Sequence, residues 1–71
     1  MKQENNMTYQ ITFTITTATK KLIKQFAEDH NTTVKASANN TYIFSSDSFD
    51  NLHELASDFL NKDATDLIIK I

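Results

Sequence analysis

The nine residues TYQITFTIT, from Thr8 to Thr16, alternate between apolar and polar side chains. The odd positions, from Tyr9 to Ile15, are apolar, and the even positions are almost all threonine. A period of two places the apolar side chains on one face of a strand and the threonines on the other. The pattern therefore predicts a half-buried strand over residues 7–16. Its threonine-lined face is left for solvent, a partner protein or a nucleic acid.

The rest of the chain contains two helical patterns and three more strand patterns. Apolar residues recur at helical spacing over residues 17–30 and 47–60, and asparagines at 31 and 61 are suited to end the two helices. Thr16 or Thr17 is the expected N-cap of the first helix, and Asp47 or Ser48 that of the second. The remaining strands are expected over residues 32–38, 41–46 and 66–71.

The element order is therefore β-α-β-β-α-β, in a single domain spanning residues 7–71 after a polar, disordered tail of residues 1–6. With short connections and right-handed crossovers, this order closes as two split β-α-β units. The prediction is an α+β fold of the ferredoxin-like arrangement. It has an antiparallel four-stranded sheet in the order 4-1-3-2 with both helices on one face. The expected core comprises Tyr9, Ile11, Phe13, Leu22, Phe26, Leu52, Leu55, Phe59 and Ile69.

The turn between the second and third strands decides which face the aromatic residues Tyr42 and Phe44 occupy. A two-residue loop, Asn39-Asn40, turns both rings onto the open face, which then resembles the stacking platform of RNA-recognition domains. A three-residue loop with Asn40 left-handed turns both rings into the core. Burial favours the three-residue loop, because each buried ring contributes about 1.5–3 kcal/mol.

Composition narrows the possible functions. The chain has no glycine and no cysteine, and its seven basic residues are all lysine. Without glycine, Walker-type and Rossmann phosphate loops and the nucleophile elbow are excluded. The lack of arginine argues against a dedicated nucleic-acid binder. The lack of cysteine favours a cytoplasmic location.

The residues that most often carry chemistry do not form a recognisable site. His30 and His53 lie on different expected helices without metal-ligand spacing. Ser45, Ser46 and Ser48 near His53 form no convincing triad, because short loops without glycine leave no obvious oxyanion hole. We therefore expect no enzymatic activity, no metal and no cofactor. The longest apolar run is three residues, so no membrane association is expected either.

Two clusters of charge remain as candidate surfaces. The four carboxylates of the second helix step by three or four residues and line one face, here called the acidic strip: Asp47, Asp50, Glu54 and Asp58. Lys20, Lys21 and Lys24 crowd the start of the first helix, where they oppose its dipole. We expect carboxylates of the second half of the chain, such as Asp58 and Asp63, to neutralise them; a small phosphate-contacting patch is the alternative.

The favoured hypothesis is a small protein-binding module, an adaptor or inhibitor whose acidic strip contacts a basic partner such as a nuclease or nucleic-acid-binding protein. Its size and charge resemble those of counter-defence proteins of phages and mobile elements, anti-CRISPR proteins among them. The alternative is single-stranded RNA or DNA binding on the open sheet face. Its expected residues are Thr12, Thr14, Lys35, Tyr42 and Phe44. A monomer or an edge-strand homodimer is compatible with both hypotheses.

Overall fold

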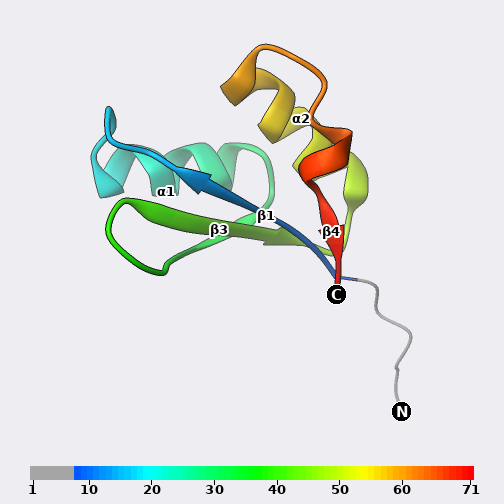
Figure 1. Cartoon of the computed structure of the whole chain (residues 1–71), viewed down its shortest axis with the longest axis horizontal. Coiled ribbons are helices and arrows are strands. Elements are labelled where there is room, and N and C mark those ends of the chain that lie inside the picture. The colour runs from blue at the N-terminus through cyan, green and yellow to red at the C-terminus, as the bar shows by residue number, and fades with distance from the viewer. Residues whose placement is uncertain (1–7) are drawn as a thin grey trace.

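The computed structural model describes residues 8–71 as an open sheet covered by two helices (Figure 1). The expected tail, residues 1–6, lies outside the described residues. The elements follow one another as β1 (Tyr9–Thr14), α1 (Lys20–Asp29), β2 (Thr33–Ala36), β3 (Thr41–Ser46), α2 (Phe49–Leu60), a 3-10 helix η1 (Thr65–Leu67) and β4 (Ile69–Lys70). The predicted order of strands and helices is confirmed.

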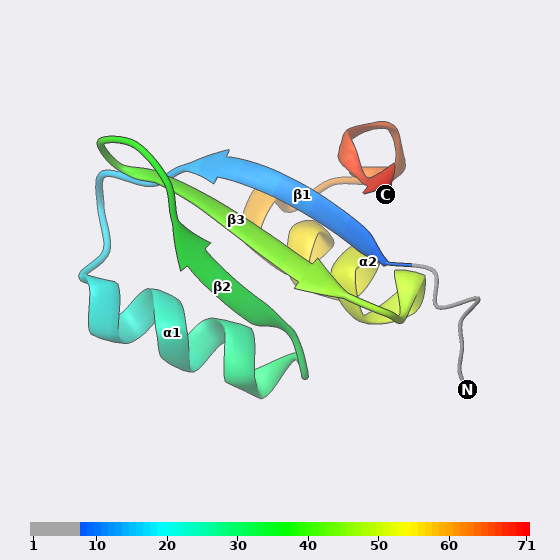
Figure 2. The same cartoon turned by 90° about the horizontal axis from the view of Figure 1, so that it is seen from below.

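The four strands form one antiparallel sheet in the order β2-β3-β1-β4, which is the predicted order read from the other edge. β1 and β3 pair along their whole length, from Tyr9 opposite Ser46 to Thr14 opposite Thr41. Figure 2 shows β2 at one edge of this sheet with α1 beside it, and α2 behind β1 and β3. The two central strands thus carry most of the sheet contacts.

The core lies between the sheet and the two helices. Ile11, Phe13 and Ile15 are buried, whereas Thr12 and Thr14 on the opposite face of β1 are exposed. Alternation in the sequence therefore assigned the two faces of this strand correctly. Buried side chains from both helices pack against this one apolar face: Ile23, Ala27, Leu52, Leu55 and Ala56.

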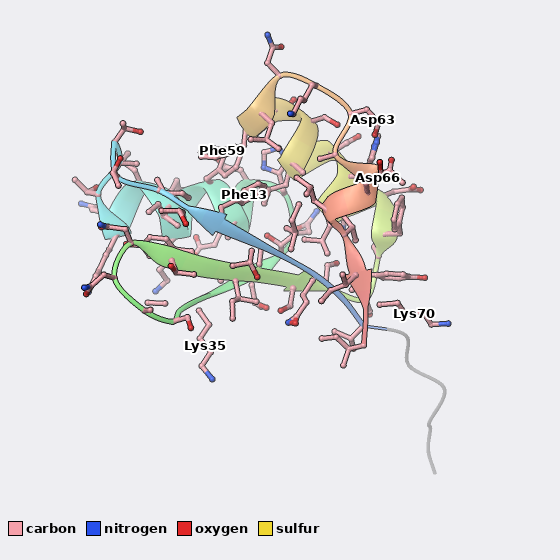
Figure 3. The ribbon with its side chains drawn as sticks, viewed as in Figure 1. Phe13, Lys35, Phe59, Asp63, Asp66 and Lys70 are labelled. Carbon is pink, nitrogen blue, oxygen red and sulfur yellow. The ribbon has the colours of Figure 1, made fainter. Side chains whose placement is uncertain are left out.

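Three members of the expected core are largely outside it. Leu22 and Ile69 are 60% and 56% exposed, and Ile23 occupies the buried position on α1 that Leu22 was expected to fill. Phe59 is 38% exposed, yet its ring lies 4.8 Å from that of Phe13 between centroids (Figure 3). Phe59 therefore covers the rim of the core rather than its centre.

Polar side chains cap the N-terminal ends of both helices, and asparagines adopt left-handed backbone where the helices end. Thr19 is the N-cap of α1, accepting a hydrogen bond from the Leu22 amide, so the prediction of Thr16 or Thr17 is wrong. Ser48 caps α2 as predicted. Left-handed backbone at Asn31 and Asn61 confirms the two predicted stops.

The hairpin between β2 and β3 has the three-residue loop that burial favours. The Ser37 amide donates to the Thr41 carbonyl, and Asn40 has a φ of 58°. Ala36 therefore pairs with Tyr42. Tyr42 and Phe44 consequently face the helices and are buried.

The C-terminal segment departs from the prediction of a strand over residues 66–71. Only Ile69–Lys70 form β4, because the 3-10 helix Thr65–Leu67 occupies the preceding residues. Ala64 is buried against the core, which anchors this turn. Beyond β4, the Ile71 amide donates to the Thr8 carbonyl and extends the pairing by one bond.

Candidate interaction surfaces

The open face of the sheet carries threonines beside Ile43 and Ile69, and it lacks the aromatic platform that the nucleic-acid alternative requires. Thr12, Thr14 and Lys35 lie on it and are exposed, and Lys35 points away from the helices (Figure 3). Tyr42 and Phe44 lie on the opposite face, because the hairpin loop has three residues rather than two. The structure therefore divides the five predicted nucleic-acid-binding residues between two faces and leaves no ring for a base to stack on.

The acidic strip runs along the solvent side of α2. Asp47 precedes the helix, Asp50 lies in its first turn, and Glu54 and Asp58 follow at intervals of four residues. All four side chains are exposed. Within residues 8–71, the first three accept no hydrogen bond and join no ion pair. They are therefore available to a cationic group outside the molecule.

Asp58 is different, because it bonds to the other helix. Its Oδ2 lies 2.9 Å from His30 Nε2, and His30 Nδ1 lies 3.0 Å from the Phe26 carbonyl oxygen. Both neighbours are acceptors, so only the doubly protonated imidazolium satisfies both bonds at once. Partial burial lowers the pKa of His30, but the Phe26 carbonyl, the Asp58 carboxylate and the charge of Glu54 together raise it by more. The net result is a pKa above the ordinary value of 6.5.

The second histidine bonds to the turn that follows α2. His53 Nε2 lies 3.1 Å from Asp63 Oδ1, and the His53 ring stacks on Phe49 at 5.9 Å between centroids. The same Asp63 oxygen accepts bonds from the Thr65 hydroxyl and the Thr65 amide. These donors, the hydroxyl foremost, lower the pKa of Asp63 to about 2.

The lysines of α1 do not meet the carboxylates expected to neutralise them. Asp58 and Asp63 each pair with a histidine, and no lysine belongs to an ion pair of the described chain. The first turn of α1 also contains no acidic residue. Positive charge therefore accumulates at this helix start without internal compensation.

The serines that precede α2 have structural roles. Ser46 Oγ accepts a hydrogen bond from the Ser48 amide, and Ser48 Oγ accepts one from the Asn51 amide. His53 bonds to Asp63 rather than to a serine. These bonds shape the turn into the helix and assemble no serine-histidine pair.

A groove lies between α1 and β2, and sequence analysis gave no sign of it. It encloses about 430 Å³. Its lining combines apolar and threonine side chains with two lysines and one glutamate: Lys20, Ile23, Lys24, Ala27, Glu28, Thr32, Thr33, Val34, Ala36 and Tyr42. Ala36 faces the helix side of the sheet and yet is exposed, so the helices leave this edge uncovered.

Residues 8–71 contain no group of three or more histidine, cysteine, aspartate or glutamate side chains placed to hold a metal ion. Among the same residues, no helix has the length and apolar character needed to cross a membrane. Comparison with protein-family models, with curated proteins and with solved structures finds no match to this chain.

Proposed function

We propose that this chain is a non-enzymatic protein-binding module, an adaptor or inhibitor that docks a basic protein on the acidic strip. We further propose that its four strands and two helices form a ferredoxin-like domain, as the strand order 4-1-3-2 suggests. A nuclease or nucleic-acid-binding protein would offer the basic surface, and small acidic inhibitors of such proteins occur in phages and mobile elements.

The observation that carries the proposal is a set of exposed carboxylates, at the start of α2 and along it, that form no hydrogen bond or ion pair within residues 8–71. Asp47 just before α2, and Asp50 and Glu54 on it, are exposed, with no cationic side chain bonded to them in the described part of the chain. Charges in this arrangement steer an oppositely charged partner during its approach and raise the association rate. Because α2 is packed on the sheet, the carboxylates are held on a rigid element.

The open sheet face supports the nucleic-acid alternative less well. It presents threonines, Ile43, Ile69 and one lysine, Lys35, while the rings of Tyr42 and Phe44 contribute to the core. Single-strand binding depends on stacking and on a positive groove. Neither feature occurs on this face.

The test compares two double variants that change the net charge equally. Asp50→Asn with Glu54→Gln removes two charges from the acidic strip. Asp29→Asn with Asp66→Asn removes two exposed charges outside it. Each pair is used as bait in crosslinking capture from the native host, and the recovered partner is then measured by stopped-flow association across a salt series.

The proposal predicts a slower and less salt-dependent association for the acidic-strip variant, with the control variant close to the parent. Circular dichroism should show that both variants remain folded. Equal association rates and salt slopes for the parent and the acidic-strip variant would remove α2 from the interface.

A further inference from the structure

We propose that the groove between α1 and the edge of β2, here called the α1/β2 groove, binds an extended acidic peptide of another protein. The peptide adds to the sheet as a fifth strand beside β2. This site lies on α1 and β2, away from the acidic strip of α2, and its partner has the opposite charge. The proposal is therefore independent of the proposed function.

The first argument is the hydrogen-bonding pattern of β2. The Ser37 amide donates to the Thr41 carbonyl at 2.9 Å, which identifies these two residues as a hydrogen-bonded pair of the ladder. Such pairs alternate in an antiparallel sheet, so Lys35 also bonds to β3 while Val34 and Ala36 turn their backbone groups outward. β2 is an edge strand. Its outward amides and carbonyls can pair with another strand.

The second argument is the shape and lining of the groove. Its apolar wall is formed by Ile23 and Ala27 of α1 and by Val34 of β2. The exposed Ala36 leaves room next to the edge where a side chain of the added strand would lie. A strand beside β2 would direct every second side chain into this space.

The third argument is a tyrosine hydroxyl group without a hydrogen-bond partner in the described residues. Tyr42 is only 8% exposed and lines both the α1/β2 groove and an adjoining hollow of about 460 Å³ at the β2–β3 loop. Within residues 8–71 its hydroxyl makes no hydrogen bond. The hydroxyl can therefore donate to a ligand carboxylate in the groove.

The fourth argument is charge. Lys20 and Lys24 line the groove, and Lys35 lies on the other face of the same sheet edge. Glu28 is the one carboxylate among the lining residues. The helix dipole adds positive potential near Lys20, at the start of α1. The edge is therefore complementary to an acidic peptide.

The experiment measures binding of a defined probe to the full chain by fluorescence anisotropy at low salt. The probe is a fluorescein-labelled seven-residue peptide of alternating glutamate and valine with blocked ends. One control peptide replaces glutamate with lysine, and another carries a methyl group on every backbone amide. We expect both controls to bind at least about tenfold more weakly, because one reverses the charge and the other blocks strand pairing.

Variants of the protein separate strand pairing from charge. Ala36→Pro removes an amide that points out of the sheet and is expected to keep the fold, as proline is tolerated on edge strands. It should abolish binding of the glutamate–valine peptide. Lys20→Gln with Lys24→Gln should weaken binding about tenfold and flatten its salt dependence. The matched control, Lys21→Gln with Lys62→Gln, changes the same charge outside the groove and should alter binding less than about twofold.

Several results would overturn the proposal. These are undiminished binding by Ala36→Pro or by the methylated peptide, equal losses in the two lysine pairs, and no binding at millimolar peptide. If the protein binds oligothymidine and not the peptide, the groove lysines contact nucleic-acid phosphates rather than peptide carboxylates. The protein could instead form a dimer that Ala36→Pro dissociates and the peptide does not. That result would show that the β2 edge binds a second copy of the chain. If Ala36→Pro fails to fold, the methylated peptide decides the question of pairing.

Discussion

His30 and Asp58 join the two helices across 28 residues of sequence, with His30 Nε2 2.9 Å from Asp58 Oδ2. Near this bond the rings of Phe26 and Phe59 also meet, at 6.1 Å between centroids. The bond therefore fixes the end of α1 against the last turns of α2, at the rim of the core.

This bond makes stability depend on pH. Because folding raises the pKa of His30, its contribution is fully present below the unfolded value of about 6.5 and is lost as pH rises through the folded pKa. The charge of Glu54, on α2 like Asp58, also raises the pKa of His30. Asp58→Asn should therefore lower the free energy of unfolding near pH 5.5 by up to about 1 kcal/mol, and near pH 8.5 by much less. Urea unfolding at the two pH values measures the difference, and an equal loss at both would contradict the prediction.

Asp63 acts in the opposite direction. Its pKa is lowered to about 2, so its contribution is present above the ordinary value of 3.8 and is lost as pH falls through the folded pKa. Thr65→Val removes the hydroxyl that lowers this pKa most and should raise the pKa of Asp63. Carboxyl NMR titration of the parent and the variant measures the shift. An unchanged midpoint would show that the 2.6 Å contact between Thr65 Oγ1 and Asp63 Oδ1 does not form in solution.

The same substitution at two helix positions tests the core. Leu55 is fully buried on α2, whereas Leu22 is 60% exposed on α1. Leu55→Ala should lower the free energy of unfolding by about 2–5 kcal/mol, because it leaves a cavity. Leu22→Ala should change it by less than about 0.5 kcal/mol. Denaturant unfolding of both variants measures the contrast, and similar losses would show that the two helices are placed differently on the sheet.

The β2–β3 loop offers a test of backbone conformation. Asn40 has a φ of 58°, and the adjacent Asn39 has no positive φ. Asn40→Ala should lower the free energy of unfolding by about 1 kcal/mol, since alanine tolerates the left-handed region less well than asparagine. Asn39→Ala is the matched control and should have a smaller effect. Thermal unfolding of the two variants distinguishes them; equal midpoints would favour a different loop.

Much of the fold follows from the sequence alone. Strict alternation in Tyr9–Thr14 assigns the faces of β1, because a strand has only two. The asparagines at 31 and 61 mark the helix ends, since few other residues adopt the left-handed backbone. The free energy gained by burying Tyr42 and Phe44 predicts the three-residue loop and hence the hairpin register. Each of these inferences rests on a local rule.

The remaining features depend on how elements lie in space. Leu22 and Ile23 are adjacent on α1, and only the placement of that helix beside β2 makes Ile23 the buried one. The bond between His30 and Asp58 joins two helices, and no sequence pattern predicts how far apart these helices lie. The α1/β2 groove arises for the same reason. The sequence predicts the acidic strip, but it does not predict that Asp58 bonds to His30.

Residues 8–71 build three left-handed turns from asparagine, and the sequence contains no glycine. Glycine gives an unfolded chain its widest choice of backbone conformations, and folding must then remove that freedom. A chain without it begins from a narrower denatured ensemble and loses less entropy when it folds. A domain with so small a core gains little free energy from apolar burial. The lower entropy cost of folding offsets part of that shortfall in stability.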